Sequence, residues 1–302
     1  WVDLWGPKGS DSIYIKVPKI IFYDQNKEGL GDISEEDRIL AINEVDSLDY
    51  LLKVWDTSLE VRFVEKLGYL EKYNAIITKR IKADFLFKKF RIHDQFGKSN
   101  DSGFDPVKNG LCNFGASLRT FHSVSSEATQ FYADDHELKF EKYLGVLEKY
   151  GVGSKKLSVV KKYLAEHKGY SCDSYLVNNF KGIDIRQIFI KGNELFIIDP
   201  GKISTGLAEV DIARFVVTCR ILYWGTSAII RKTRPSVRYE KAFLDGYYAS
   251  DDRAQKIIKF LIIKEVLKHW KMAHISLSKR NWNGYVKLFL RKIYIDSFYY
   301  AI

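Results

Sequence analysis

The sequence predicts an α+β protein with a small, sheet-rich first lobe at residues 1–83 and a larger, mainly helical second lobe at residues 84–302. The first 83 residues contain two strand-like segments, one amphipathic helix pattern and two more strand-like segments. The remaining residues contain one helix pattern after another, interrupted by a single strand-rich segment. A chain of 302 residues with 46% hydrophobic and 28% charged residues can also bury a substantial core.

The first two predicted strands, at residues 2–5 and 13–17, are separated by a segment rich in turn formers at residues 6–10. Because side chains alternate along a strand, Ile13, Ile15 and Val17 share one face and Tyr14 and Lys16 the other. Lys16 therefore points away from the apolar face. It is either a solvated strand lysine or a lysine that contacts phosphate.

A helix is predicted after Ser34, which has the side chain of an N-cap and is followed by three acidic residues. Glu44 lies on the flank of its apolar stripe. Strands are expected next, at 61–67 and 75–81. The residues of the apolar stripe recur at spacings of three and four: Ala41, Val45, Leu48, Leu52 and Trp55.

The second lobe is predicted to be helical over most of its length. Pro106 is suited to the first turn of a helix, and apolar residues recur from Val107 to Phe121 at helical spacing. Similar patterns predict further helices at 137–148, 155–167, 252–276 and 282–300.

The strand-rich segment of the second lobe carries polar side chains at two strand ends. Residues 188–190 and 195–198 form a predicted hairpin around the turn at 191–193. Gln187 precedes its first strand and Asp199 follows its second, so the two side chains can face one cleft. Amide and carboxylate oxygens are suitable ligands for Mg²⁺.

The order of these elements resembles the aminoglycoside phosphotransferase-like and choline-kinase-like branch of the protein-kinase-like fold. The resemblance covers nearly the whole chain and implies two lobes, with a small antiparallel sheet in the N-lobe. The matching segments are the strand 13–16, the helix end 118–123, the loop and hairpin 180–199, the D-x-A at 211–213 and the F-L-x-G-Y at 243–247.

The resemblance implies an ATP site and Mg²⁺ as cofactor. By this likeness Lys16 contacts the α- and β-phosphates and Glu44 holds it in place. Asp199 and Gln187 bind the metal, and Asp211 braces the catalytic loop. The backbone around Lys79, Arg80 and Ile81 forms the hinge that reads adenine.

The catalytic loop departs from the pattern H-G-D-x-x-x-x-N of this branch. With Gln187 in the asparagine position, Gly182 stands where the catalytic aspartate is expected and Phe180 where the histidine is expected. Asp184 is the candidate base if the loop is shorter here. The alternative is that Asp184 caps the local backbone or pairs with Arg186.

These features predict an ATP-dependent phosphotransferase, a kinase that transfers the γ-phosphoryl group to a hydroxyl of a small molecule or saccharide. The alternative is a catalytically silent kinase-like module that binds a nucleotide or a partner. Nucleic-acid binding is a third interpretation, based on the net charge of +10 and the basic run at 231–234, and we expect no specific nucleic-acid partner. The sequence does not specify which acceptor is used. It also does not decide between ATP and GTP as the phosphoryl donor.

The cysteine content and the hydropathy pattern bear on the compartment. The 3 cysteines, Cys112, Cys172 and Cys219, are an odd number without close spacing, which favours a reducing environment over a disulfide framework. No run of about 18 apolar residues occurs, so neither a membrane span nor a signal peptide is expected. We therefore predict a cytoplasmic protein.

Overall fold

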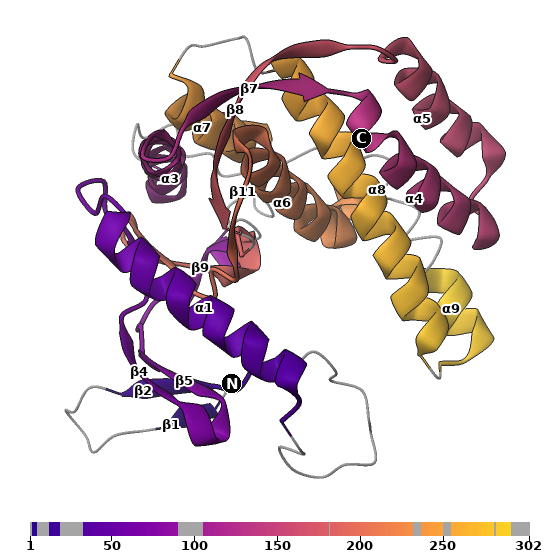
Figure 1. The fold of residues 1–302 in the computed structure, drawn as a ribbon. Coiled ribbons are helices and arrows are strands. Elements are labelled where there is room, and N and C mark those ends of the chain that lie inside the picture. Colours follow the sequence, from indigo (N-terminus) through magenta and orange to yellow (C-terminus); the bar gives the residue numbers. More distant parts are fainter. Residues whose placement is uncertain are drawn as a thin grey trace.

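The computed structural model describes residues 2–4, 12–18, 33–89, 105–180, 182–231, 237–249, 255–280 and 282–290. It has the predicted α+β architecture, with a small sheet region beside a larger helical portion (Figure 1). The glycines of the first turn, Gly6 and Gly9, the basic residues 232–234 and the end of the last predicted helix, 291–300, lie outside the described residues.

The first sheet is antiparallel and has the strand order β1-β2-β5-β4. Its strands are β1 (Val2–Leu4), β2 (Ile13–Lys16), β4 (Lys66–Leu70) and β5 (Ala75–Lys79). β1 pairs antiparallel with β2, as expected for the two predicted strands, and β2 continues the sheet by pairing with β5.

Helix α1 (Glu35–Val54) crosses beside this sheet (Figure 1). Ser34 accepts a hydrogen bond from the Asp37 amide and the Asp37 carboxylate accepts one from the Ser34 amide. The helix therefore begins at the predicted N-cap, and the two residues form a capping box. Leu51 is fully buried, whereas Leu52 is 45% exposed. The predicted apolar stripe is therefore wrong at Leu52, because the helix places Leu51 and not Leu52 against the core.

The second sheet has the order β3-β10-β9-β6. It contains β3 (Val61–Phe63), β6 (Asp84–Phe85), β9 (Ile188–Lys191) and β10 (Glu194–Ile197). β9 and β10 form the predicted hairpin, while β3 runs parallel to β10. The strand expected at 61–67 is thus divided between two sheets. Strands from both predicted lobes share this sheet, and the boundary at 83 stays a prediction.

A third sheet was not predicted. It has the order β11-β8-β7, with β7 (Glu127–Tyr132), β8 (Ser171–Phe180) and β11 (Ile203–Leu207) in antiparallel pairing. The long β7–β8 ribbon extends from the region of α3 toward α4 and α5 (Figure 1). β8 ends at Phe180, where the loop that leads to the β9–β10 hairpin begins.

The helices of the second lobe confirm the predicted helical segments within the described residues. They pack around an aromatic core in which Phe114, Phe215 and Phe243 contact one another. None of the described helices is long and apolar enough to cross a membrane. In chain order they are α3 (Pro106–Ser123), α4 (Glu137–Lys149), α5 (Ser154–Glu166), α6 (Ala208–Arg231), α7 (Val237–Tyr248), α8 (Gln255–Lys279) and α9 (Gly284–Leu290), with short 3-10 turns at Glu71–Tyr73, Asp134–His136 and Ile185–Gln187.

Candidate functional site

Three charged side chains from distant parts of the chain meet between the first sheet and the β9–β10 hairpin. Lys16 Nζ lies 2.6 Å from Glu44 Oε2 and 2.5 Å from Asp199 Oδ1. The Lys16 side chain is 14% exposed and that of Glu44 5%, so both are largely removed from water. The pairing of Lys16 with Glu44 is the one expected from the sequence, and Asp199 joins it.

Each member of this cluster is positioned by a regular element. Lys16 ends β2 opposite Ile76 of β5, and Glu44 lies on the buried face of α1. Asp199 follows β10 and has a φ of 58°, which places a non-glycine residue in the left-handed region. Residues held in such conformations often occur at functional sites. The amide of Gly182 donates a 2.7 Å hydrogen bond to the Pro200 carbonyl and helps to fix this turn.

The cluster contains two carboxylates and one ammonium. Burial raises the pKa of Glu44 to about 7, and the nearby Asp199 carboxylate also raises it, while Lys16 acts in the opposite direction. Asp199 is the more exposed of the two carboxylates, with 27% of its side chain accessible against 5% for Glu44. Asp199 is therefore the carboxylate that a ligand can reach.

A cavity of 310 Å³ opens beside Asp199. Gln187 also lines it, and its side-chain oxygen is buried with no hydrogen-bond partner among the described residues. The cavity is lined by Tyr14, Val64, Thr78, Lys79, Ile81, Phe85, Arg186, Gln187, Phe189, Ile198 and Asp199. No three His, Cys, Asp or Glu side chains of the described residues form a metal cluster. The unpaired Gln187 oxygen and the Asp199 carboxylate nevertheless fit Mg²⁺, which takes one or two carboxylates and completes its shell with phosphates and water.

The three expected hinge residues differ in how they meet the cavity. Lys79 and Ile81 line it, whereas Arg80 does not, and its guanidinium lies 5.8 Å from the centre of the Tyr14 ring. The Lys79 amide donates to the Glu65 carbonyl and the Arg80 amide to the Ser12 carbonyl, each at 2.9 Å. Two of the three hinge amides are thus already bonded within the protein.

The loop that follows β8 has no room for a side chain at Gly182. A Cβ there would overlap the Asp199 carbonyl oxygen and lie 2.5 Å from the Pro200 carbonyl carbon. Phe180 is fully buried, with ring centroids 5.6 Å from Phe63 and 6.0 Å from Trp55. The two positions that depart from the family pattern are therefore structural here.

Asp184 takes part in the local contacts that the sequence left as an alternative to catalysis. Its carboxylate accepts hydrogen bonds from the Arg186 amide and from Arg186 Nε, both at 2.9 Å, and pairs with the Arg186 guanidinium again through the second oxygen. Only 15% of the side chain is exposed. Asp184 does not line the cavity that contains Gln187 and Asp199, whereas Arg186 does.

Asp211, expected to brace the catalytic loop, is fully buried near the start of α6. Its carboxylate accepts a 3.1 Å hydrogen bond from the Phe180 amide and lies 3.4 Å from His122 Nε2. His122 Nδ1 in turn lies 2.8 Å from the Tyr247 hydroxyl. The helix end at 118–123 and the segment at 243–247, singled out in the sequence, thus meet at Asp211.

Several residues of this region were not identified from the sequence. Arg186 was considered only as a partner of Asp184, although it also lines the cavity. The rings of Phe85 on β6 and Phe189 on β9 are in contact, with ring centroids 4.3 Å apart. The only available signal was their position beside Gln187 and the hinge, since aromatic residues in strands usually belong to the core.

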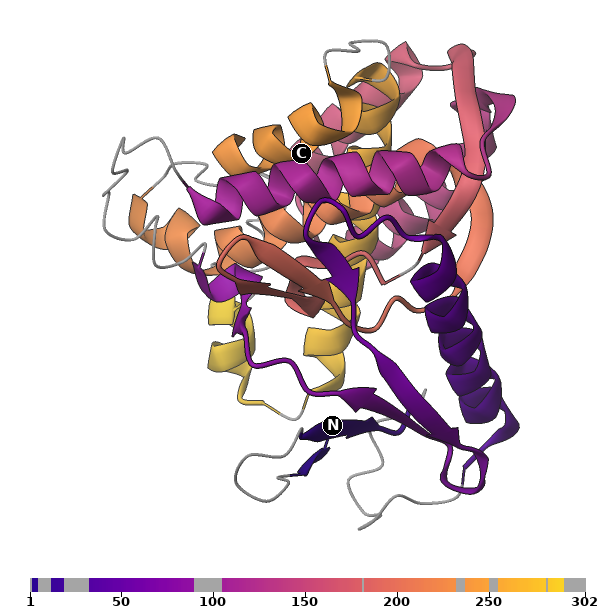
Figure 2. The same cartoon turned by 90° about the vertical axis from the view of Figure 1, so that its left-hand side faces the viewer.

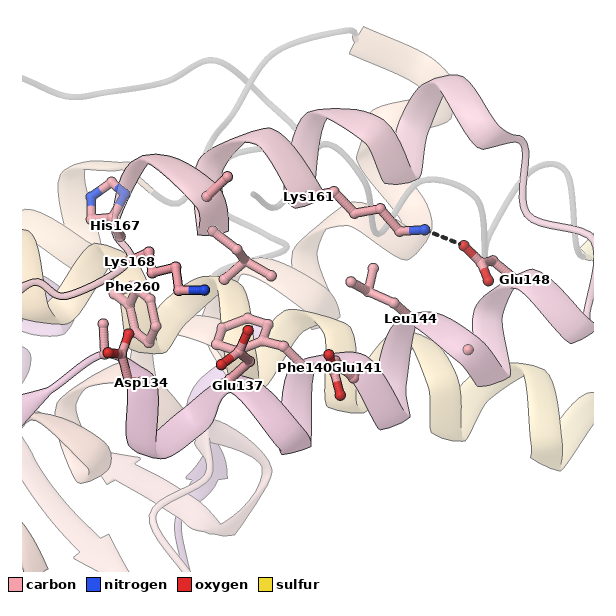
Figure 3. Close-up of a pocket in the computed structure, with 14 residues that line it drawn as sticks. Asp134, Glu137, Phe140, Glu141, Leu144, Glu148, Lys161, His167, Lys168 and Phe260 are labelled. Atoms are coloured by element: carbon pink, nitrogen blue, oxygen red, sulfur yellow. Dashed lines mark hydrogen bonds and ion pairs between the residues drawn. The ribbon is translucent and has the colours of Figure 1, made fainter.

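A larger cavity, of 470 Å³, lies between α4 and α5 (Figure 3). Its floor is apolar, with Phe140, Leu144 and Phe260, and Lys161 pairs with Glu148 across one end at 2.6 Å. None of the predicted site residues lines it. Size alone therefore does not identify the functional site, and the smaller cavity beside Asp199 carries the converging polar groups.

No protein-family model matches the sequence, and no curated protein sequence matches it either. Solved structures do. A macrolide 2'-phosphotransferase from Brachybacterium faecium is 9% identical, with a TM-score of 0.53 over 94% of this chain and 84% of that chain. A glucosamine kinase is 11% identical, with a TM-score of 0.52 over 86% of this chain and 67% of that chain.

An aminoglycoside phosphotransferase in an ADP-bound structure is 12% identical, with a TM-score of 0.51 over 98% of this chain and 93% of that chain. At these identities the likeness concerns the fold. Together with the order of the elements, it shows that the chain has the aminoglycoside phosphotransferase-like and choline-kinase-like form of the protein-kinase-like fold.

Proposed function

We propose that the protein is an ATP-dependent phosphotransferase that transfers the γ-phosphoryl group to a hydroxyl of a small molecule or saccharide. The observation that carries this proposal is the contact of Lys16 with both Glu44 and Asp199 at the edge of a cavity lined by hinge residues. Two solved proteins of the same fold are named as phosphotransferases, one of them in an ADP-bound structure, and a third is named as a glucosamine kinase.

In the proposed complex the adenine occupies the 310 Å³ cavity, between Ile81 of the hinge and Phe189 of β9. Because the Lys79 and Arg80 amides are bonded internally, the Ile81 amide is the hinge donor available to the base. Lys16 contacts the α- and β-phosphates, and Glu44 keeps its ammonium group in place.

Asp199 and Gln187 are the residues that would hold Mg²⁺. When bound, the ion neutralises charge on the phosphate oxygens. The cost of burying the unpaired Gln187 oxygen, on the order of 1–3 kcal/mol, is then offset by a ligand. To hold the ion, Asp199 gives up its contact with Lys16. Lys16 then contacts Glu44 and the phosphates.

The transfer itself needs a base that takes one proton from the substrate hydroxyl. The acceptor oxygen bonds to the γ-phosphorus as the bond from phosphorus to the β–γ bridging oxygen breaks, ADP leaves, and Asp184 takes the hydroxyl proton. For this step the Asp184 carboxylate has to release Arg186.

A second candidate function is nucleotide binding without transfer. Two observations favour it: Gly182 cannot carry a side chain, and Asp184 is engaged by Arg186 outside the cavity. In that case the fold acts through the shape of its nucleotide-bound state.

The deciding experiment measures ATP turnover with a panel of hydroxylated acceptors. If Asp184 is the base, Asp184→Asn lowers turnover about a hundredfold to ten-thousandfold. Arg186→Gln, which frees Asp184 without removing it, retains far more turnover. Nucleotide affinity is measured in both variants by calorimetry, because Arg186 lines the cavity. Nucleotide binding with no transfer to any acceptor by the wild type would favour the second candidate.

Two further proposals concern the setting of this activity. The acceptor is a small molecule or saccharide, a proposal that the name of the glucosamine kinase of the same fold supports. The location is cytoplasmic, which the free cysteines Cys112, Cys172 and Cys219 support, since unpaired thiols persist in reducing compartments. We expect no nucleic-acid partner that the protein recognises by its base sequence.

A further inference from the structure

A basic groove borders the segment that links β5 to β6. Two cavities of 450 and 470 Å³ adjoin there and share Lys82 and Lys191 in their walls. We call their combined lining the hinge groove. It also shares Val64, Lys79 and Ile81 with the cavity beside Asp199. The linking segment runs beside the β9–β10 hairpin, as Figure 2 shows.

The hinge groove has a strong excess of positive charge. Its cationic lining residues among those described are Arg62, Lys79, Arg80, Lys82, Lys89 and Lys191, and its acidic ones are Glu65 and Asp84. In the whole chain the ratio is much closer to even, with 48 cationic and 38 acidic residues. The groove is therefore one place where the net charge of +10 is concentrated.

Part of this charge is already paired. Lys89 lies 2.8 Å from Asp84, Lys79 lies 3.6 Å from Glu65, and Arg62 lies 3.4 Å from Glu194. Lys82 and Lys191 have no carboxylate partner among the described residues, and both are exposed. Because both line each of the two cavities, these two ammonium groups stand where the cavities join.

The floor of the groove is apolar. Leu52, whose exposure departs from the predicted stripe of α1, lines it together with Ile81 and the half-buried Phe196. A groove with spaced cations along an apolar floor suits a chain of phosphates that carries flat apolar groups. A membrane surface would need a flat or convex basic face, and a single small anion would use one cation pair only.

We propose that the hinge groove binds linear phosphate chains without reading sequence, and that its ligand is single-stranded nucleic acid. Inorganic polyphosphate offers the same backbone charge but no bases for the apolar floor. The two sources are therefore distinguishable by their affinity per phosphate. The absence of sequence preference follows because contacts to phosphate carry no base information.

The test uses the full chain and a fluorescein-labelled oligothymidylate of about 16 nucleotides, long enough for one such site. Binding is followed by anisotropy between about 50 and 200 mM salt, the range in which phosphate contacts weaken steeply. Each lysine that contacts phosphate in a single strand contributes about 0.7 to the slope of log K against log salt. Lys82→Ala with Lys191→Ala should make the slope shallower by about 1.4 and weaken binding about 25-fold at 0.1 M salt.

The matched control removes two exposed lysines from α4 and α5, Lys149→Ala with Lys155→Ala, and changes net charge equally. It should bind like the wild type. Equal losses in both double variants, no loss in the groove variant, or no binding by the wild type at 50 mM salt would overturn the proposal. Polyphosphate that competes equally well per phosphate would overturn the assignment to nucleic acid. Lys16→Ala should bind the oligonucleotide normally, which separates this test from the proposed nucleotide site.

Discussion

Gly182 is the residue at which this chain departs most sharply from the catalytic loop that its fold implies. Its amide bonds to the Pro200 carbonyl, and its missing side chain leaves space for the Asp199 backbone. The same backbone gives Asp199 its left-handed conformation and directs its carboxylate toward Lys16. The absence of a side chain at position 182 and the placement of Asp199 are therefore connected.

Restoring an aspartate at this position should harm the protein. Gly182→Asp places a Cβ against the Asp199 carbonyl, so we expect a loss of at least about 1–3 kcal/mol in the free energy of unfolding and no gain in turnover. Gly182→Ala should show the same loss, because the Cβ is the cause. Chemical denaturation and ATP turnover check this. A Gly182→Asp protein as stable as the wild type and more active would show that the loop differs from this description.

His136 provides a pH-dependent prediction at the same scale. Burial lowers its pKa to about 4, and the neighbouring Lys264 and Lys139 lower it as well. The unfolded chain therefore binds the proton more tightly than the folded one, and stability present above the usual pKa of 6.5 is lost as pH falls toward 4. We expect a loss of about 1–2 kcal/mol for this partly exposed group.

Replacing the imidazole by a ring that cannot titrate should remove this loss. The His136 ring lies 5.5 Å from Phe131 and 5.9 Å from Phe260, and its Nδ1 is buried without a hydrogen-bond partner, so His136→Phe suits the site. Urea denaturation at pH 7 and pH 4.5 measures the effect. If the variant loses as much stability on acidification as the wild type, the acid sensitivity originates elsewhere.

At this scale the sequence indicated the side chains of the site better than their contacts. Lys16, Gln187 and Asp199 were predicted from strand alternation and strand ends, and Glu44 from its place on the flank of a helix. The structure brings Lys16, Glu44 and Asp199 into contact, and the roles of these residues stay predictions. The sequence could not decide between an ion pair of Asp184 with Arg186 and a catalytic role of Asp184, because the same local sequence is compatible with either. The internal bonds of the Lys79 and Arg80 amides depend on strand neighbours distant in the sequence.

Helices α3 and α7 approach each other unusually closely. A Cβ at Gly246 would overlap the Cys112 carbonyl oxygen and lie 2.8 Å from its carbonyl carbon, and a Cβ at Gly115 would lie 2.8 Å from the Tyr247 amide nitrogen. This contact brings Tyr247 within 2.8 Å of His122, which in turn contacts Asp211. The glycine of the F-L-x-G-Y segment thus supports the contacts of Tyr247 and His122 with Asp211, the residue proposed to brace the catalytic loop.

Gly246→Ala should therefore separate α3 from α7. We expect a cost of about 1–3 kcal/mol or more, because neither backbone can yield without repacking. Gly145→Ala in α4 is the matched control, since a Cβ there meets nothing within 4 Å and alanine is the better helix former. Thermal and chemical denaturation compare the two. A neutral Gly246→Ala would contradict the close approach of the two helices.

The elements that were predicted are those with local signals. The N-cap and acidic first turn of α1, Pro106 of α3 and the two-residue turn of the β9–β10 hairpin can each be recognised from a few adjacent residues. The β7–β8 pair was missed because its strands are joined through two helices and alternate weakly. The parallel pairing of β3 with β10 joins residues more than a hundred positions apart and leaves no local pattern.

In the whole molecule the candidate site combines residues that are far apart in the sequence. Lys16 and Glu44 come from the predicted first lobe, Gln187 and Asp199 flank the β9–β10 hairpin, and the second sheet contains strands from both parts. Charge is distributed unevenly over the same molecule, with a basic hinge groove and acidic residues along the α4–α5 cavity. The order of the elements predicted the fold, whereas this distribution of charge became visible only in three dimensions.

The most direct test of the central claim is the thermal stabilisation of the protein by ATP with and without Mg²⁺. A ligand at a hundredfold excess over its dissociation constant stabilises the folded state by about 2.7 kcal/mol, which is readily measured. We expect wild-type protein to be stabilised by ATP and more strongly with Mg²⁺, Lys16→Ala to lose most of the stabilisation, and Asp199→Ala to lose only the part that depends on Mg²⁺. If both variants are stabilised as strongly as the wild type, the nucleotide does not bind at the cluster of Lys16, Glu44 and Asp199.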